Sequence, residues 1–388
     1  MRLIKPLPDP FLMPNGRRVS SLQDWTLQRL EIQRMMIELQ YGSLPSKPEN
    51  ISVKLLEKKI GAGGTSIEKF RMILSPKNDR PDIHFFMDFN ITNPSHIGNN
   101  HHNASKNKLS PNRLPTLIYV GNNTCKIATD NGFKVIYFDN SQIEPMEMGR
   151  PLLGPARKAY DILEPRRYSW GSIAAWAWAA MRLVDHALTM PDVDPKKIMI
   201  SGHSRNGKTA LLAGALDERI AIVNPAGSGC AGAGSYLALG ENCEDLKSLT
   251  NRERWWAWTH KNLDQWANHE KDLPFDQHFL MGLVAPRPLL LTEGTTDYWA
   301  NPIGTCVTHM ATQSIYRFLH STQYNGIFFH EGGHDHTEED FSALIDFANS
   351  YFFSTPTKKT FKMVLPEAEK FSDAILWDTP KTKKLGSL

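Results

Sequence analysis

The chain has 388 residues, of which 41% are hydrophobic and 22% are charged, so its length and composition are those of a folded globular protein. Its formal charge is only +3 at pH 7, which excludes the strongly basic surface of a nucleic-acid-binding protein. No stretch reaches the roughly 18 uncharged apolar residues of a membrane span. We therefore expect a soluble monomer that binds neither nucleic acid nor membranes.

The first elements read as an external helix and a pair of antiparallel strands. Residues 17–41 place apolar side chains at helical spacing and end at a glycine, which predicts an amphipathic helix. Residues 49–64 and 66–76 form two β-rich runs separated by glycines, which predicts a hairpin at the edge of a larger sheet.

From residue 82 onward, short apolar runs alternate with helical segments, as in a parallel sheet covered on both faces. The strongest helix candidates are residues 170–188, 207–219 and 338–352. We predict one domain over residues 1–355 and a C-terminal extension over residues 356–388.

Residues 93–113 are polar and rich in Asn and His, and they interrupt this pattern. Three histidines there (His96, His101 and His102) leave a metal site open as an alternative. No carboxylate lies between them and nothing sets their geometry, so we expect a solvated loop without metal.

The sharpest local signal is KKIMISGHSRNGKTALLAGAL, in which an apolar strand runs through Gly202-His203-Ser204-Arg205-Asn206-Gly207 into an Ala/Leu-rich helix. This order of strand, tight turn and helix is that of a nucleophile elbow, whose small residues accommodate a strained serine. The second glycine stands three residues after Ser204 instead of the usual two. The elbow predicts an α/β-hydrolase fold, a three-layer αβα sandwich with a mostly parallel central sheet and an antiparallel N-terminal edge.

In that fold a carboxylate and then a histidine follow the serine, each on the loop after a later strand. Asp297 follows the apolar run RPLLLTEG, and His334 follows GIFFHEGG. Glu293 is a rival for the acid and His336 a rival for the base. With Ser204, Asp297 and His334 in place, we predict a serine esterase that forms an acyl-enzyme and needs no cofactor.

The same residues resemble the glucuronoyl esterases of carbohydrate esterase family 15, especially the bacterial branch. The resemblance covers most of the chain and is most specific in the SRNGK run that begins at Ser204. It extends from LPDPFLMPNGRRVSSLQDW through YSWGSIAAWAWAAMRLVDHAL to LPFDQHFLMGLVAPRPLLLTEGTTDYWANP and GGHDHTEEDF.

The resemblance implies roles for four more residues. Arg205 would stabilise the oxyanion, and Lys208, Glu241 and Trp299 would bind the uronic acid. From the residues alone, Arg205 and Lys208 could equally be exposed helix residues, Trp299 a core side chain and Glu241 a charge at a helix end.

The chain departs from the family at one place that bears on the acid. Many members carry a glutamate after the strand that follows the elbow, whereas this chain reads Asn224-Pro225-Ala226-Gly227-Ser228. The resemblance then implies that Asp297 is the only triad acid.

The substrate that the resemblance implies is an ester of (4-O-methyl-)glucuronic acid in glucuronoxylan or in linkages between lignin and carbohydrate. An acetyl esterase acting on xylan and a carbohydrate-binding relative with impaired catalysis remain alternatives. The resemblance also implies a secreted or periplasmic protein, although the chain shows no apolar signal segment at its start.

Overall fold

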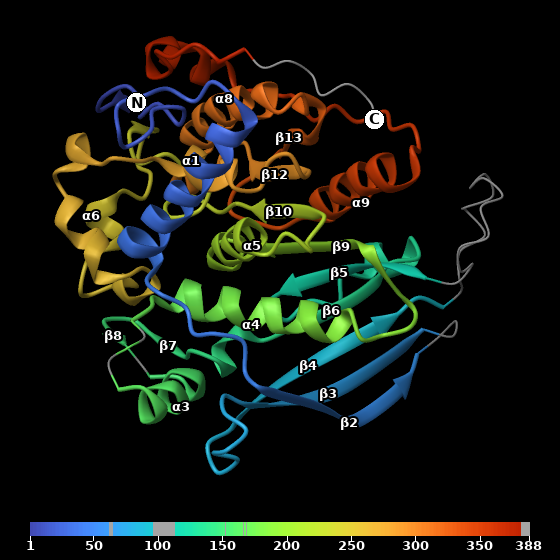
Figure 1. The fold of residues 1–388 in the computed structure, drawn as a ribbon. Coiled ribbons are helices and arrows are strands. Elements are labelled where there is room, and N and C mark those ends of the chain that lie inside the picture. The colour runs from blue at the N-terminus through green and yellow to red at the C-terminus, as the bar shows by residue number, and fades with distance from the viewer. Residues whose placement is uncertain (62–64, 96–112, 152, 166, 168, 382–388) are drawn as a thin grey trace.

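The computed structural model describes residues 1–61, 65–95, 113–151, 153–165, 167 and 169–381 (Figure 1). Most of the predicted loop at 93–113, with its three histidines, lies outside the described residues. None of the helices in these ranges is long and apolar enough to cross a bilayer.

A nine-stranded sheet forms the centre of the described part of the chain (Figure 1). Its strand order is β13-β12-β10-β9-β5-β6-β4-β3-β2. The strands are β2 Asn50–Ile60, β3 Ser66–Ser75, β4 Phe85–Asn93, β5 Leu114–Val120, β6 Lys134–Phe138, β9 Val193–His203, β10 Ile222–Ala226, β12 Leu289–Gly294 and β13 Asn325–His330. Four short strands lie outside it: β1 Arg2–Leu3, β7 Met146–Glu147, β8 Arg150–Pro151 and β11 Ala238–Leu239.

The sheet is parallel from β6 to β13 and antiparallel at its other side. β2 and β3 form the predicted antiparallel hairpin. β4 is also antiparallel to β3 and to β6, so the antiparallel part is one strand wider than the sequence predicts. The apolar run at 82–90 predicts a strand but not whether that strand is parallel or antiparallel to its neighbours. The strand direction is set by the connection that precedes the run.

Helices cover both faces of the sheet, which confirms the predicted three-layer sandwich. The three strongest helix candidates are α4 Ser172–Ala187, α5 Arg205–Leu216 and α9 Glu338–Phe353. The N-terminal helix α1, Leu22–Met36, continues through a π-helical turn to Tyr41. The other helices are α2 Lys126–Asp130, α3 Pro155–Leu163, α6 Leu246–Leu249, α7 Gln277–Gly282 and α8 Pro302–Phe318. Short 3-10 turns occupy residues 140–142, 256–258, 261–266, 270–272, 298–300, 322–324 and 366–374.

Two apolar cores lie on opposite faces of the sheet. In β12, Leu289 and Leu291 join the larger core, which contains α4, α5 and α8, whereas Leu290 joins the smaller core under α2 and α9. This alternation follows from the two-residue period of a strand. Both faces of the parallel strands are therefore buried, as their continuous apolar runs indicate.

The two edges of the sheet are protected differently. At β13, the chain after α9 runs alongside the strand, and the Ile327 N–H donates to the Phe361 carbonyl at 2.8 Å. Residues 366–374 then pack against α8, and the Trp377 ring stacks on His278. At the opposite edge, β2 is exposed and carries Lys54, Lys58 and Lys59.

We expect Phe89→Ala and Phe86→Ala to differ in their effect on stability, because Phe89 lies on the buried face of β4 and Phe86 on the exposed face. Phe89 is fully buried and stacks on Phe70, whereas Phe86 is 44% exposed. Phe89→Ala should lower the free energy of unfolding by about 3–5 kcal/mol, because the cavity that it leaves cannot collapse. Phe86→Ala should lower it by less than about 1 kcal/mol. Urea denaturation measures both, and equal effects would contradict the described orientation of β4.

Candidate active site

Ser204 stands at the junction of β9 and α5 in a strained backbone conformation, with φ 59° and ψ −125°. Its N–H donates to the Ala226 carbonyl of the neighbouring strand β10 at 2.9 Å. A side chain at Gly202 would begin 2.4 Å from the Asn206 carbonyl, and one at Gly207 would begin 2.6 Å from that of Ala226. The glycine three residues after the serine is thus required because the first turn of α5 passes so close to β10.

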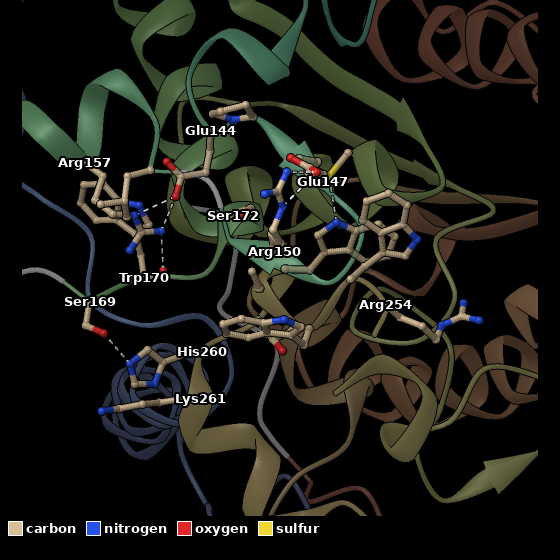
Figure 2. Close-up of a pocket in the computed structure, with 18 residues that line it drawn as sticks. Glu144, Glu147, Arg150, Arg157, Ser169, Trp170, Ser172, Arg254, His260 and Lys261 are labelled. Atoms are coloured by element: carbon tan, nitrogen blue, oxygen red, sulfur yellow. Dashed lines mark hydrogen bonds and ion pairs between the residues drawn. The ribbon is translucent and has the colours of Figure 1, made fainter. Parts of the chain in front are cut away.

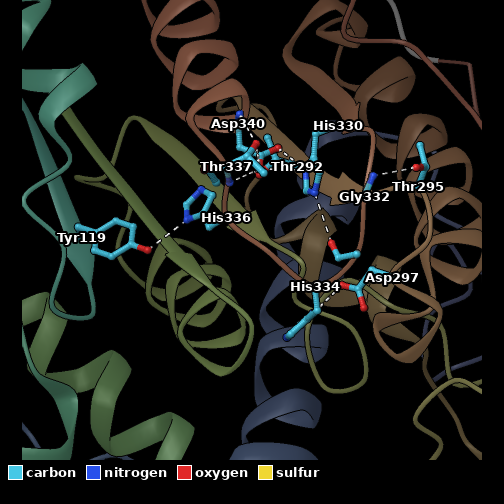
Figure 3. Close-up of polar contacts among 12 residues, drawn as sticks. Tyr119, Thr292, Thr295, Asp297, His330, Gly332, His334, His336, Thr337 and Asp340 are labelled. Carbon is cyan, nitrogen blue, oxygen red and sulfur yellow. Dashed lines mark hydrogen bonds and ion pairs between the residues drawn. The ribbon is translucent and has the colours of Figure 1, made fainter.

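Ser204, His334 and Asp297 form a continuous hydrogen-bonded line. His334 Nε2 lies 2.8 Å from Ser204 Oγ. On the other side of the ring, His334 Nδ1 lies 2.5 Å from Asp297 Oδ2 (Figure 3). Asp297 follows β12 and is buried, and its Oδ1 accepts a hydrogen bond from the Ala300 N–H at 3.2 Å. All three side chains come from the carboxyl ends of strands, where the sequence predicts them.

The rival acid, Glu293, is fully buried within β12. Burial, reinforced by the charge of Asp297, raises the pKa of its carboxyl group well above the usual value. Burial therefore favours the neutral form of Glu293, and it is Asp297 whose carboxyl group meets the imidazole of His334.

The rival base, His336, points away from Ser204. Its Nδ1 lies 3.1 Å from the Tyr119 hydroxyl (Figure 3), and its ring stacks on Phe341 at a centroid distance of 4.1 Å. Burial lowers the pKa of this histidine to about 3. A neutral imidazole that packs against Phe341 and bonds to Tyr119 has no access to the proton of Ser204.

The loop that carries His334 is held at both of its ends. At the end of β13, His330 Nδ1 lies 3.0 Å from Asp340 Oδ1, and its Nε2 lies 3.3 Å from the Gly333 carbonyl. Asp340 also accepts hydrogen bonds from the N–H and hydroxyl of Thr337 at the start of α9 (Figure 3). Asp340 thus connects the start of α9 to His330 at the end of β13. The sequence pattern alone did not indicate this role for Asp340.

Beside Ser204 and His334 opens a cavity of about 240 Å³, which we call the first cavity. Charged and aromatic side chains form its walls, together with the backbone of Gly227 and Gly229. The side chains are Arg205, Lys208, Glu244, Arg254, Trp255, Trp258 and Trp299. The structure therefore brings Arg205, Lys208 and Trp299 to the predicted nucleophile.

Lys208 is one helical turn beyond Ser204 and is only 4% exposed. Its Nζ donates to the carbonyls of Ser228, at 2.7 Å, and Cys230. It also lies 3.8 Å from Glu244 Oε2 and 5.6 Å above the Trp258 ring. An ammonium group has three N–H donors, so one remains for a molecule in the first cavity.

Glu241 does not reach the first cavity, and the expectation for it needs correction. Its side chain is 77% exposed and faces the N-terminal amine at 3.6 Å. After β11 the chain turns through Asn242, at φ 56°, and the next carboxylate, Glu244, is buried against Lys208 and Arg254. Glu244 is therefore the acidic side chain of the cavity wall, and burial raises its pKa.

Arg254 and Trp299 also line the first cavity. The Arg254 guanidinium lies 4.8 Å above the Trp299 ring and 3.8 Å from Glu244 Oε1. Trp299 is 40% exposed, so its ring faces open space in part. Arg254, Trp255 and Trp258 lie between residues 250 and 260, where the sequence has no helical or strand period that would have singled them out.

Gly227 marks the position where the family pattern would place a second acid. A side chain there would begin 3.1 Å from His203 Nε2 and 3.6 Å from Asp297 Oδ2. The His203 ring lies 4.6 Å from that of His334, and burial lowers its pKa to about 4. A neutral histidine thus fills the space beside the base. Within the described ranges, no group of three His, Cys, Asp or Glu side chains is arranged to hold a metal ion.

Comparisons with known proteins identify relatives of this chain. A family model described as "Glucuronyl esterase, fungi" matches residues 91–320. The carbohydrate esterase MZ0003, from an unknown prokaryotic organism, is 29% identical over 89% of this chain and 89% of its own. A 4-O-methyl-glucuronoyl methylesterase of Podospora anserina is 30% identical over 77% of this chain and 57% of its own.

Two solved structures extend the likeness to the fold. A glucuronoyl esterase of carbohydrate esterase family 15 from Caldicellulosiruptor kristjansonii superposes with a TM-score of 0.77 at 26% identity, over 94% of this chain and 96% of its own. A mutant glucuronoyl esterase from Sporotrichum thermophile, in complex with methyl 4-O-methyl-β-D-glucopyranuronate, has a TM-score of 0.72 at 25% identity, over 92% and 90%.

We expect His336→Phe to make the protein less sensitive to acid. In the unfolded chain a histidine titrates near pH 6.5, whereas His336 in the folded state has a pKa of about 3. Below pH 6.5 the unfolded state binds the extra proton, so stability falls as the pH falls. At pH 5 this one group should account for about 2 kcal/mol of that loss.

Urea denaturation at pH 7 and pH 5 measures the difference. Between pH 7 and pH 5 the variant should lose less unfolding free energy than the wild type. Loss of the hydrogen bond to Tyr119 lowers the stability of the variant at both pH values and does not affect this difference. The exposed His84, changed to Phe, is the matched control for replacing a histidine by phenylalanine. An equal pH dependence in His336→Phe and in the wild type would contradict the burial described.

Proposed function

Because the chain belongs to the glucuronoyl esterase family, carbohydrate esterase family 15, we propose that it cleaves esters at the carboxyl group of glucuronic or 4-O-methylglucuronic acid. It is a carboxylic ester hydrolase with the α/β-hydrolase fold. The observation that carries the proposal is the hydrogen-bonded series Ser204, His334 and Asp297. Ser204 and His334 line a cavity whose walls also contain cationic side chains and tryptophans.

In the proposed mechanism, His334 takes the proton of Ser204 as Oγ attacks the ester carbonyl. The tetrahedral oxyanion is stabilised by the Arg205 guanidinium and by the free N–H groups at the start of α5. His334 then gives its proton to the departing alcohol as the C–O bond breaks. A water molecule, deprotonated by His334, releases the uronate and restores Ser204, while Asp297 stabilises the imidazolium in both steps.

The first cavity suits a uronic acid on the acyl side of the ester. The spare N–H of Lys208 can donate to a ring hydroxyl, and the carboxylate of Glu244 can accept from one. The exposed ring of Trp299 offers an apolar face to the C–H groups of the sugar. The relative that was solved with methyl 4-O-methyl-β-D-glucopyranuronate supports this substrate class.

Two alternatives are less well supported. An acetyl ester places only a methyl group on the acyl side, where Lys208 and Glu244 would have nothing to bind. A relative without catalysis would not need the buried Asp297 or the hydrogen bond between His334 and Ser204. Since such uronate esters occur in plant polysaccharides, we also propose that the protein works outside the cytoplasm.

The first test compares hydrolysis of the methyl and benzyl esters of glucuronic acid with that of an acetylated sugar. The wild type should cleave the uronate esters preferentially, and Ser204→Ala should lower kcat by at least about 10⁴-fold. Circular dichroism of the variant confirms that it is folded. Preferential release of acetate would favour the acetyl esterase alternative, and cleavage of neither ester by folded protein would sink the proposal.

A second test separates the two candidate acids. Asp297→Asn should lower kcat on a uronate ester by about 10³–10⁴-fold, because the amide no longer stabilises the imidazolium or its tautomer. Glu293→Gln is the matched control, since burial favours the neutral form of Glu293 and the change is nearly isosteric. It should change kcat by less than about threefold. The opposite ranking would make Glu293 the triad acid.

A further inference from the structure

His330, the last residue of β13, forms a buried pair with Asp340 of α9 beside the turn that carries the catalytic base (Figure 3). The two side chains are only 2% and 1% exposed. His330 Nδ1 lies 3.0 Å from Asp340 Oδ1 and 2.9 Å from Oδ2. Its Nε2 lies 3.3 Å from the carbonyl oxygen of Gly333, the residue before His334. Neither His330 nor Asp340 lines the first cavity.

The turn Gly332–Gly333 depends on backbone hydrogen bonds for its position. Gly332 adopts φ 139°, and a side chain built at Gly333 would begin in open space, so no side chain packs to hold the turn. The Gly332 carbonyl accepts from the Thr296 N–H at 2.8 Å, which ties it to the loop after β12. The Gly333 carbonyl faces the ring of His330. This ring therefore helps to fix the backbone from which the imidazole of His334 projects.

Both ring nitrogens of His330 face oxygen acceptors. Asp340 Oδ2 accepts from the N–H of Thr337 at 2.8 Å and from its hydroxyl at 2.9 Å, and such bonds favour the ionised carboxylate. Neither a carboxylate nor a backbone carbonyl can donate, so each ring nitrogen must donate for both contacts of His330 to be hydrogen bonds. An imidazole ring has two N–H donors only in its positively charged form. The arrangement thus suits an imidazolium whose charge Asp340 balances.

His260 shows the arrangement of a neutral histidine. Its Nδ1 accepts from the Asn262 N–H at 3.2 Å, and its Nε2 lies 2.8 Å from the Ser169 hydroxyl (Figure 2). A ring nitrogen that accepts carries no proton, so only Nε2 of His260 bears one. Burial lowers the pKa of His260, in keeping with a neutral ring. The partners of His260 and His330 therefore call for different protonation states.

The other titratable groups near His330 leave Asp340 as its counter-charge. Burial is the main cause of the low pKa of His203, at the end of β9, and of His336, and a positive charge on His330 lowers both further. On β12, burial raises the pKa of Glu293, and the negative charge of Asp340 adds to that effect. The neighbours from β9, β12 and the loop thus favour their neutral forms.

We propose that His330 is a positioning residue for the catalytic base and that it acts in its positively charged form. The imidazolium, held by Asp340, donates to the Gly333 carbonyl and keeps His334 aligned with Ser204. When the ring gives up a proton to solvent, the remaining N–H stays on Nδ1, because it faces the negative carboxylate. The lone pair of Nε2 then faces the Gly333 oxygen, and the turn is released. This inference rests on the proposed function, because the base that it positions is that of the ester hydrolysis.

The kinetic test follows kcat against pH on the methyl ester of 4-O-methylglucuronic acid, corrected for spontaneous hydrolysis. In the wild type, kcat should rise as His334 becomes neutral and fall at alkaline pH as His330 loses its charge. Asp340→Asn removes the negative charge that stabilises the imidazolium, so the alkaline fall should move at least about one pH unit lower. His330→Gln keeps an N–H donor toward Gly333 at every pH, so it should lower kcat but abolish the alkaline fall. KM should stay within about twofold in both variants.

Thr337→Ala is the matched control for damage to the start of α9. It removes one hydrogen bond to Asp340 but keeps the carboxylate, so it should lower stability and leave the alkaline fall at the same pH. Circular dichroism at each pH confirms that the proteins are folded. An equal loss of kcat at every pH in Asp340→Asn would overturn the proposal and leave the esterase function standing. A wild-type kcat that stays constant until the protein unfolds would do the same.

Nuclear magnetic resonance tests the charge of His330 without any substrate, so its result stands even if no uronate ester is cleaved. In wild-type protein labelled with nitrogen-15 in its histidine rings, His330 should carry a proton on both ring nitrogens at pH 7, and His260 on one. The signals of His330 are assigned by their loss in His330→Gln. Ser204→Ala should give the same pattern, since Ser204 does not contact the pair. A single ring proton on His330 at pH 7 would overturn the proposal.

Discussion

The strained backbone of Ser204 is the constraint on which the site depends. A φ of 59° in a non-glycine residue costs about 1–3 kcal/mol, and it persists only where its surroundings hold it in place. Here the hydrogen bond to Ala226 and the close contacts at Gly202 and Gly207 do so. They tie the turn to β10, so the serine projects beyond the carboxyl edge of the sheet.

The parallel strands then bring the other groups to the serine. β10, β12 and β13 are consecutive neighbours in the sheet, so their carboxyl ends lie along one edge. Asp297 leaves β12 and His334 leaves β13 at that edge, where their side chains meet. Residues 130 positions apart can thus form a hydrogen bond of 2.8 Å, because each is placed by a strand that is buried on both faces.

This dependence on strand ends explains what the sequence could predict. Ser204, Asp297 and His334 each stand within a few residues of the end of an apolar run, so their positions could be inferred by counting from the strand. Asp340 could not, because its role depends on where α9 begins relative to His330. The choice between Asp297 and Glu293 also needed the structure, since both are buried near the end of the same strand and only the contact with His334 separates them.

The cavity wall was harder to predict, for a physical reason. Glu241 and Glu244 are three residues apart in a turn that passes through Asn242 in the left-handed conformation, and the sequence does not indicate which of the two points inward. Arg254, Trp255 and Trp258 lie in a segment of short 3-10 turns, where no regular period distinguishes inward from outward positions. Specificity in this fold resides in irregular segments, whereas the reacting groups reside on regular ones.

The covering of β13 by the chain around Phe361 bears on how the protein behaves in a crowded solution. An uncovered strand at the edge of a sheet is a template on which another molecule can add a strand and start an aggregate. β2 resists this through its row of lysines, which repel a second copy. β13 has no such row of lysines, since its side chains are buried. The segment around Phe361 therefore protects β13 from pairing with a strand of another molecule.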